Sequence, residues 1–200
     1  MISKSGRFAK RTFDIVVSFF GILFLSPAVL FMWLLASFDT KNNGFYLQKR
    51  VGRHGKIFHL IKIRTMIELK GQTSTITKSN DPRITYFGSK LRKYKLDELP
   101  QLFNIFIGQM SFVGPRPDVK GYADELKGRD KIILSIRPGI TGPSSIKYKN
   151  ESQLLSLQKD AKKYNDEIIW PDKVKINKEY VINWSFKSDI QYIIETVIRR

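Results

Sequence analysis

A long uncharged stretch near the N-terminus constrains this chain more than any other feature. Residues 15–38 carry no charged side chain, and Asp14 and Asp39 bracket them. As a straight helix the stretch would extend roughly 36 Å at 1.5 Å per residue, enough to cross a bilayer core of about 30 Å. It is too long for the apolar part of a typical signal peptide, and no small-residue cleavage site follows it. We therefore expect an N-terminal membrane helix.

Ser26-Pro27, near the midpoint of the stretch, bears on how this helix meets the membrane. Proline removes a backbone hydrogen bond and bends a helix, and the Ser26 hydroxyl can satisfy a carbonyl that is left free. Both flanks are equally basic, which draws both ends to the cytoplasmic side. A broken helix that enters and leaves by one face fits both observations. Proline is also tolerated in spanning helices, so the residues alone leave both topologies open.

Asp97 and Glu98 form a pair of adjacent carboxylates with Arg92, Lys93 and Lys95 before them. Leucine or phenylalanine at 99, 102, 103 and 106 has helical spacing, which predicts a helix with one buried face. Pro100 suits a first helical turn, so we expect both acids at the helix N-terminus, where the macrodipole and the cations depress the carboxylate pKa values and keep the acids ionised. Such carboxylates suit a nucleophile or a metal ligand, although helix capping is the more common reason for such a pair when it is taken in isolation.

Two strands are expected at 45–51 and 57–64, joined by a turn at 52–55. Alternation places Lys62 and Arg64 on the same face of the second strand, so the two cations should project together. Edge strands also carry lysines for solubility alone.

Arg116 lies between two prolines, and Arg137 directly precedes Pro138. Proline restricts its own backbone and that of the residue before it, so each arginine has a stiff, non-helical backbone. This arrangement suits a bidentate phosphate clamp, and an ordinary proline-rich turn is the alternative at either position.

The net charge of +17, from 35 basic and 18 acidic residues, indicates an anionic partner. Without cysteine there is no disulfide scaffold or thiolate zinc site, and the two histidines make a poor metal site. Any metal should be a hard cation on carboxylate oxygen, with Mg²⁺ the natural candidate near phosphates. The sequence has no phosphate-binding glycine loop, so chemistry fuelled by ATP or using a dinucleotide has no support. It also has no helix-turn-helix or RNA-binding signature, so we expect no nucleic-acid partner.

These patterns predict an α+β membrane protein in two parts. Residues 1–40 would form a basic N-terminus and a membrane helix broken at Ser26-Pro27. Residues 41–200 would form a compact domain with a β-hairpin and several amphipathic helices, two of them at 154–168 and 189–200. A polar stretch at 68–80 is expected to be a loop.

Taken in order, the motifs resemble those of the small monotopic phosphoglycosyl transferases, the bacterial sugar transferase family that primes glycan assembly on polyprenyl phosphate. The matching segments are Ser26-Pro27, Lys62-Ile63-Arg64-Thr65-Met66, Asn80-Asp81-Pro82-Arg83, Leu96 to Asn104, Gly108 to Pro117 and Arg137 to Gly142. Each motif is weak on its own, and the ordered series is specific.

The resemblance implies a monotopic protein, with a re-entrant membrane helix in residues 1–40 and a cytosolic catalytic domain in residues 41–200. It also implies a two-step reaction at the inner face of the bacterial cytoplasmic membrane. Asp97 would attack the β-phosphorus of a UDP-sugar, releasing UMP, and polyprenyl (undecaprenyl) phosphate would then take the phosphosugar from Asp97. Mg²⁺ near Asp97 and Glu98 would stabilise the leaving UMP, with Glu98 assisting metal binding or acceptor activation. The resemblance also implies a phosphate-binding role for five cations: Lys62, Arg64, Arg92, Arg116 and Arg137.

The chain departs from the commonest family pattern in the region expected to shape the sugar pocket. Pro143-Ser144-Ser145 stands where many relatives have Trp-Ala-Gln, and Asn177 stands at a frequent aspartate, with Asp172 nearby as an imperfect substitute. Two other functions are weighed against the transferase. They are a membrane-anchored basic module that binds anionic lipid or nucleic acid, and a metal-dependent phosphodiesterase using Asp97 and Glu98.

Overall fold

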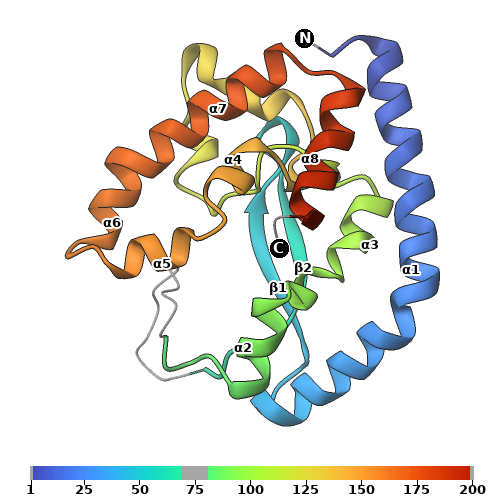
Figure 1. Cartoon of the computed structure of the whole chain (residues 1–200), viewed down its shortest axis with the longest axis vertical. Helices are drawn as coiled ribbons and strands as arrows, with labels where there is room; N and C mark the ends of the chain where they lie inside the picture. The colour runs from blue at the N-terminus through green and yellow to red at the C-terminus, as the bar shows by residue number, and fades with distance from the viewer. Residues whose placement is uncertain (1, 69–80, 199–200) are drawn as a thin grey trace.

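A computed structural model describes residues 2–68 and 81–198 of the chain (Figure 1). It combines many short helices with two small sheets and one long apolar N-terminal helix, consistent with monotopic anchoring. The α-helices are α1 (Lys4–Thr40), α2 (Tyr86–Lys93), α3 (Gln101–Phe106), α4 (Pro143–Lys147), α5 (Glu151–Ser156), α6 (Ala161–Tyr164), α7 (Trp170–Ile182) and α8 (Phe186–Ile198). The strands are β1 (Phe45–Val51), β2 (Ile57–Ile63), β3 (Ser111–Val113) and β4 (Gly139–Thr141). Shorter helical turns are η1 (Arg53–Gly55), η2 (Leu96–Glu98), η3 (Ala123–Glu125), η4 (Gly128–Ser135) and the π-helical η5 (Asn165–Ile169).

The expected membrane helix is α1, which by length and composition can cross a bilayer. Helix assignment continues without interruption through Ser26-Pro27, and Figure 1 shows α1 as a bent helix whose second half turns away from the first. The Ser26 hydroxyl donates to the carbonyl of Leu23 at 3.3 Å, four residues before Pro27. This is the carbonyl that proline leaves without its usual helical donor. The path of α1 through a membrane, re-entrant or spanning, stays a prediction, as does the division of the chain at residue 40.

The predicted hairpin is confirmed, with β1 and β2 antiparallel from Phe45 opposite Ile63 to Val51 opposite Ile57. A second, parallel pair of strands, β3 and β4, was not predicted. It depends on two glycines, because a Cβ on Gly139 would lie 2.2 Å from the backbone nitrogen of Gly114. The close backbone approach brings together the two proline-flanked segments that carry Arg116 and Arg137.

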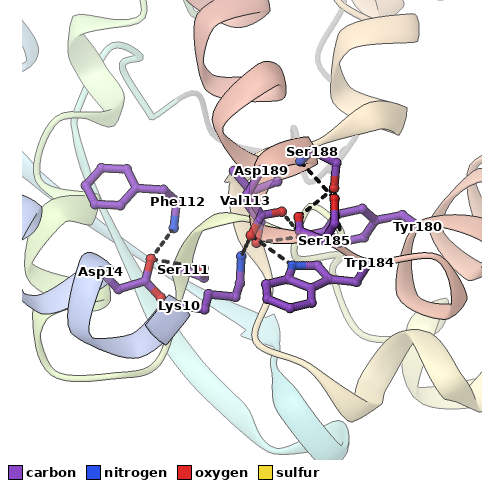
Figure 2. A network of polar contacts seen from close by, with 10 residues as sticks. All are labelled: Lys10, Asp14, Ser111, Phe112, Val113, Tyr180, Trp184, Ser185, Ser188 and Asp189. Atoms are coloured by element: carbon purple, nitrogen blue, oxygen red, sulfur yellow. Dashed lines mark hydrogen bonds and ion pairs between the residues drawn. The ribbon is translucent and has the colours of Figure 1, made fainter. Parts of the chain in front are cut away.

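A buried polar network fastens α1 to the C-terminal helices (Figure 2). Lys10 of α1 forms an ion pair with Asp189 of α8 at 2.5 Å, and both side chains are at least nine-tenths buried. Asp189 also accepts hydrogen bonds from the Tyr180 hydroxyl at 2.6 Å and the Trp184 indole at 2.9 Å. Because its partners come from α1, α7 and the segment before α8, this carboxylate fixes how these elements sit on one another.

One turn further along α1, Asp14 connects the membrane helix to β3. Its carboxylate accepts from the Ser111 hydroxyl and from the Phe112 backbone N–H, both at 3.1 Å (Figure 2). Since β3 leads directly into the segment that contains Arg116, these hydrogen bonds to α1 help to position that segment.

The prediction that the apolar stripe of the helix after the dyad is buried is wrong. In α3 the buried side chains are Gln101, Asn104 and Ile105, while Phe103 and Phe106 are 51% and 37% exposed. Asn104 explains the orientation, since its side chain accepts from the Ile61 N–H and donates to the His59 carbonyl. The polar face of α3 therefore docks on β2, and its apolar face lies beside α1, where Phe106 meets Phe19.

The helix predicted over 154–168 is interrupted, and the chain instead forms α5, α6 and η5, followed by α7. The Asp160 carboxylate accepts a hydrogen bond from the Lys163 N–H and so caps the N-terminus of α6. A new helix therefore begins after Asp160, and α5 does not continue into it. The helix predicted at 189–200 is present as α8, which begins earlier, at Phe186; the last two predicted residues, 199 and 200, lie outside the described residues. The predicted loop at 68–80 lies outside the described residues except for Glu68.

Candidate active site

The two adjacent acids lie in η2, a 3-10 turn between α2 and α3. The turn follows Lys95, which has a left-handed backbone with φ of 53°, and Pro100 directly precedes α3. Both acids are therefore at a helix N-terminus, as predicted, but at that of the 3-10 turn η2 and not that of α3. They lie one turn earlier, with Asp97 facing inward and 9% exposed.

Glu98 is bound by two cations from distant parts of the chain. The Arg116 guanidinium donates to both of its carboxylate oxygens, and the Lys62 ammonium lies 3.6 Å from Oε1. Burial alone would raise the pKa of Glu98, but the charges of Arg116 and Lys62 outweigh it and hold that pKa well below its usual range. Glu98 is thus an ionised carboxylate already paired with cations.

Asp97 differs from its neighbour in its contacts. Across residues 2–68 and 81–198 its carboxylate makes no hydrogen bond or ion pair. Burial raises its pKa, the charge of Lys62 opposes that increase, and the negative charge of Glu98 adds to it. The expectation of a depressed pKa is confirmed for Glu98 and wrong for Asp97, because desolvation exceeds the influence of the nearby cations.

Lys62 and Arg116 reach the acids from β2 and from the loop after β3. Lys62 lies on the same side of its strand as the buried Leu60, and its side chain is 17% exposed. Burial lowers the pKa of Lys62 and Glu98 opposes this, whereas Glu98 raises the pKa of Arg116. We call Asp97, Glu98, Lys62 and Arg116 the dyad cluster.

The other predicted phosphate-binding cations lie at different distances from the dyad cluster. Arg92 donates to the Met66 sulfur at 3.3 Å, and its charge acts on Asp97. Arg64 does not project with Lys62, since it binds the Asn43 carbonyl and the Glu68 carboxylate. Arg137 is not brought to the acids either, because its guanidinium donates to the Gly108 carbonyl at 2.7 Å.

Arg50 and Asp118 adjoin the dyad cluster and were not identified from the sequence as site residues. Arg50 donates to the Pro117 carbonyl at 3.1 Å, and burial together with Arg116 lowers its pKa to about 10. Burial raises the pKa of Asp118 to about 6, against the charges of Lys173 and Arg50. Asp118 lies two residues after Arg116, a spacing that could have indicated a shared site.

A cavity of about 450 Å³ lies between α1, the hairpin and α3. Its wall is mostly apolar and begins immediately after the dyad, at Leu99 and Pro100. The remaining lining comes from Gly21, Ile22, Leu25, Ser26, Val29, Asn43, Phe45, Leu47, Ile61, Leu102 and Phe103. The cavity therefore borders the segment that directly follows Asp97 and Glu98.

The positions that depart from the commonest family pattern divide into paired and unpaired polar groups. Asp172 of α7 accepts from the Lys147 ammonium and the Tyr148 hydroxyl. Asn177 is 5% exposed, and within the described ranges its Oδ1 has no hydrogen-bond donor; the Ser145 hydroxyl likewise has no partner. A buried polar atom without a partner is costly, which makes these two groups candidates to meet a polar ligand.

Carboxylate oxygens for a metal ion are few at the site. No group of three or more His, Asp and Glu side chains that could hold a metal occurs among the residues that the structure describes. Asp97 and Glu98 are adjacent, and the unpartnered oxygens of Asp97 are the ones available. Mg²⁺ is commonly held by one or two carboxylates together with substrate phosphates, so this donor set fits Mg²⁺ bound with a phosphorylated substrate.

Residues 5–200 match the family model described as bacterial sugar transferase. The chain is 34% identical to the exopolysaccharide production protein ExoY of Rhizobium meliloti, over 96% of this chain and 85% of that protein. It is 35% identical to an undecaprenyl-phosphate galactose phosphotransferase of Salmonella typhimurium, over 100% of this chain and 42% of that protein. It is 30% identical to a UDP-glucose:undecaprenyl-phosphate glucose-1-phosphate transferase of Escherichia coli, over 99% of this chain and 41% of that protein.

Proposed function

The chain belongs to the bacterial sugar transferase family, and from that premise we propose that it moves a sugar-1-phosphate from a UDP-sugar to undecaprenyl phosphate through a covalent intermediate on Asp97. As a polyprenyl-phosphate sugar-1-phosphate transferase it is an enzyme, which sets aside a binding module without chemistry. One observation carries the mechanism: Asp97 is buried and has no hydrogen-bond or ion-pair partner among the residues that the structure describes, and it lies beside Glu98, which is already bound by two cations.

In the first step a carboxylate oxygen of Asp97 attacks the β-phosphorus of the donor. The bond from that phosphorus to the bridging oxygen breaks, and UMP leaves with the oxygen. In the second step an oxygen of undecaprenyl phosphate attacks the same phosphorus and releases the Asp97 carboxylate. An unpartnered carboxylate suits this role, because no hydrogen bond must be broken before it attacks.

Lys62 and Arg116 supply positive charge next to Asp97. In the free enzyme both cations pair with Glu98, so their positions are set before a substrate arrives. A diphosphate bound at Asp97 would compete with Glu98 for these donors, and the guanidinium fork of Arg116 matches phosphate oxygens. Arg92, whose charge already acts on Asp97, would assist from α2.

Mg²⁺ would be held by Asp97. Glu98 would join it as a ligand when Lys62 and Arg116 bind the substrate phosphates in place of Glu98. The metal ion would supply charge neutralisation for the diphosphate. The protein's own contribution is to hold Lys62 and Arg116 beside the reacting phosphorus and to keep Asp97 away from bulk water.

The apolar cavity beside α1 supports a polyprenyl acceptor. It lies between the membrane helix and α3, and its wall starts two residues after Asp97. A prenyl chain in it would bring its phosphate to the dyad cluster from the membrane side, while the water-soluble donor would enter from the cytoplasm. This arrangement fits a re-entrant α1 with the catalytic domain on the cytoplasmic face.

The test is UMP release from a panel of UDP-sugars, with purified protein in detergent, Mg²⁺ and undecaprenyl phosphate. We expect sustained release from at least one donor that depends on the acceptor and is lost in Asp97→Asn. Sustained release by Asp97→Asn would rule out Asp97 as the nucleophile. No release from any UDP-sugar by folded wild-type protein would rule out a UDP-linked donor.

A further inference from the structure

Four arginines gather where α1 begins, away from the dyad cluster. Arg7 and Arg11 belong to α1, Arg53 to the turn of the hairpin, and Arg137 to the segment before β4. We call this group the N-terminal arginine cluster.

Arg11 and Arg137 meet at the end of α3. A Cβ built on Gly108 would lie 3.2 Å from Nη2 of Arg11 and 3.8 Å from Nε of Arg137, so the two guanidinium groups border the same small space. Arg11 donates to the carbonyls of Ile105 and Phe106, and Arg137 to that of Gly108, each at 2.7 Å. Burial and the charge of Arg11 lower the pKa of Arg137, which reflects repulsion between the two cations.

Arg53 extends the cluster toward the hairpin. Its Nε donates to the Ser135 carbonyl at 3.0 Å, and burial together with the charges of Arg137 and Arg7 lowers its pKa. Arg53 and Arg137 thus each use Nε for a backbone carbonyl. Within the described ranges, the terminal nitrogens of Arg53 and Arg137 make no hydrogen bond.

No acid neutralises these four side chains in the described part of the molecule, where none of them forms an ion pair. Asp14 interacts through its charge with both Arg11 and Arg137, but its carboxylate is bound to Ser111 and to the Phe112 N–H and forms no ion pair with either arginine. Repelling guanidinium groups with spare donors are stabilised by an anion that they can share.

The cluster is placed at the membrane surface by its position on α1. Arg11 and Arg7 precede the first residue of the apolar run, Ile15, by about 6 Å and about 12 Å along the helix at 1.5 Å per residue. Apolar side chains at the start of the run are exposed, with Val16 at 47% and Phe19 at 50%, and Phe8, between the two arginines in the sequence, is 76% exposed. Whether α1 is re-entrant or spanning, the start of its apolar run lies at the depth of the lipid headgroups.

We propose that the N-terminal arginine cluster binds the phosphate of an anionic membrane phospholipid, with the acyl chains lying along the exposed apolar residues of α1. The neighbouring apolar surface favours a lipid over a soluble phosphate. The excess positive charge favours a headgroup such as phosphatidylglycerol over phosphatidylcholine, whose own cation would be repelled. This site is distinct from the dyad cluster and does not depend on the proposed chemistry.

The experiment is native mass spectrometry of the full chain in detergent, titrated with phosphatidylglycerol or phosphatidylcholine. Wild-type protein should retain phosphatidylglycerol in preference. Since each basic residue near anionic lipid is worth about fivefold in affinity, Arg7→Gln should weaken retention about fivefold and Arg7→Gln with Arg53→Gln about 25-fold. Lys159→Gln removes the same charge from the exposed segment between α5 and α6, which Figure 1 shows on the side away from α1, and should change nothing.

Three results would overturn the proposal. They are equal retention of the two lipids, wild-type retention by the double variant, and displacement of phosphatidylglycerol by inorganic phosphate at equal concentration, which would indicate a site for soluble anions. The Arg7 side chain makes no hydrogen bond with the described residues, so the Arg7→Gln protein should fold normally. If the double variant does not fold, the single variant Arg7→Gln still tests the proposal.

Discussion

Neutralising the two acids one at a time should have opposite effects on stability. Glu98→Gln removes the negative charge that Arg116 and Lys62 share, leaving two cations facing each other in a largely buried site. Asp97→Asn removes a buried charge that has no partner among the described residues. Both changes preserve side-chain size, so the comparison isolates the charge.

The magnitude follows from the pairing of Glu98. Removing one partner of a buried ion pair costs about 3–5 kcal/mol, and an exposed pair is worth about 1 kcal/mol or less. Because the Arg116 side chain is 40% exposed and that of Lys62 only 17%, we take an intermediate cost of about 2 kcal/mol. In a chain of this length 1 kcal/mol shifts the melting temperature by about 2–4 °C, so Glu98→Gln should melt about 4–8 °C lower. Asp97→Asn should melt at or slightly above the wild-type temperature, because Asp97 makes no hydrogen bond or ion pair with the described residues and the variant no longer desolvates a charge.

The assay is thermal unfolding in detergent followed by tryptophan fluorescence, without substrate or metal, for wild type and both variants. Both variants should lack transfer activity, which separates stability from function. A Glu98→Gln protein as stable as wild type, or an Asp97→Asn protein less stable than Glu98→Gln, would refute this account of the dyad.

Three further predictions follow from the same contacts. Arg116 and Lys62 hold the pKa of Glu98 in the folded protein below its ordinary value of 4.5, despite burial. The ionised Glu98 therefore contributes its full stabilisation above about pH 4.5, and this stabilisation is lost as the pH falls below that value. Wild-type protein should lose melting temperature more steeply than Glu98→Gln between about pH 5 and about pH 3, and parallel curves would contradict this. Lys10→Met leaves the buried Asp189 without its cation and should lower the free energy of unfolding by about 3–5 kcal/mol. Adding Asp189→Asn to the same chain should restore part of this loss. A Lys10→Met protein with the melting temperature of wild type would rule out the ion pair as a stabilising contact. Gly114→Ala would place a Cβ 2.5 Å from the Arg137 carbonyl oxygen, so it should separate β3 from β4 and lower the transfer rate at least about tenfold; full activity would show that this close approach is dispensable.

Local patterns in the sequence were sufficient to predict the hairpin and the side of β2 that carries Lys62. Alternation has a period of two, so it assigns each strand residue to a face without reference to the rest of the chain. The pairing of Glu98 with Arg116 has no such local signal, since it depends on β3 and β4, which are each too short to show a period.

The orientation of α3 was predicted wrongly for a physical reason. Apolar residues at helical spacing indicate that a face avoids water, but they do not distinguish a protein core from a membrane or a membrane helix. Phe103 and Phe106 have the spacing of core residues and are exposed beside α1, whereas the polar Asn104 is buried against β2. A buried side-chain amide that binds strand backbone leaves no periodic signal in the sequence.

The break between α5 and α6 shows a different failure. The apolar stripe over 154–168 continues across it, and Asp160 carries an N-cap signal that the stripe concealed. The N-cap at Asp160, and not the apolar stripe, therefore determines where the chain divides into α5 and α6.

The central claim is that Asp97 carries the phosphosugar, and mass spectrometry of the quenched enzyme tests it most directly. Protein mixed with a donor that it turns over, with Mg²⁺ and without acceptor, should gain the mass of one sugar phosphate on the peptide containing Asp97. Adding undecaprenyl phosphate should remove that mass, and Asp97→Asn should never acquire it. Full donor turnover in the presence of acceptor, with no adduct on Asp97 at any quench time, would contradict the covalent mechanism.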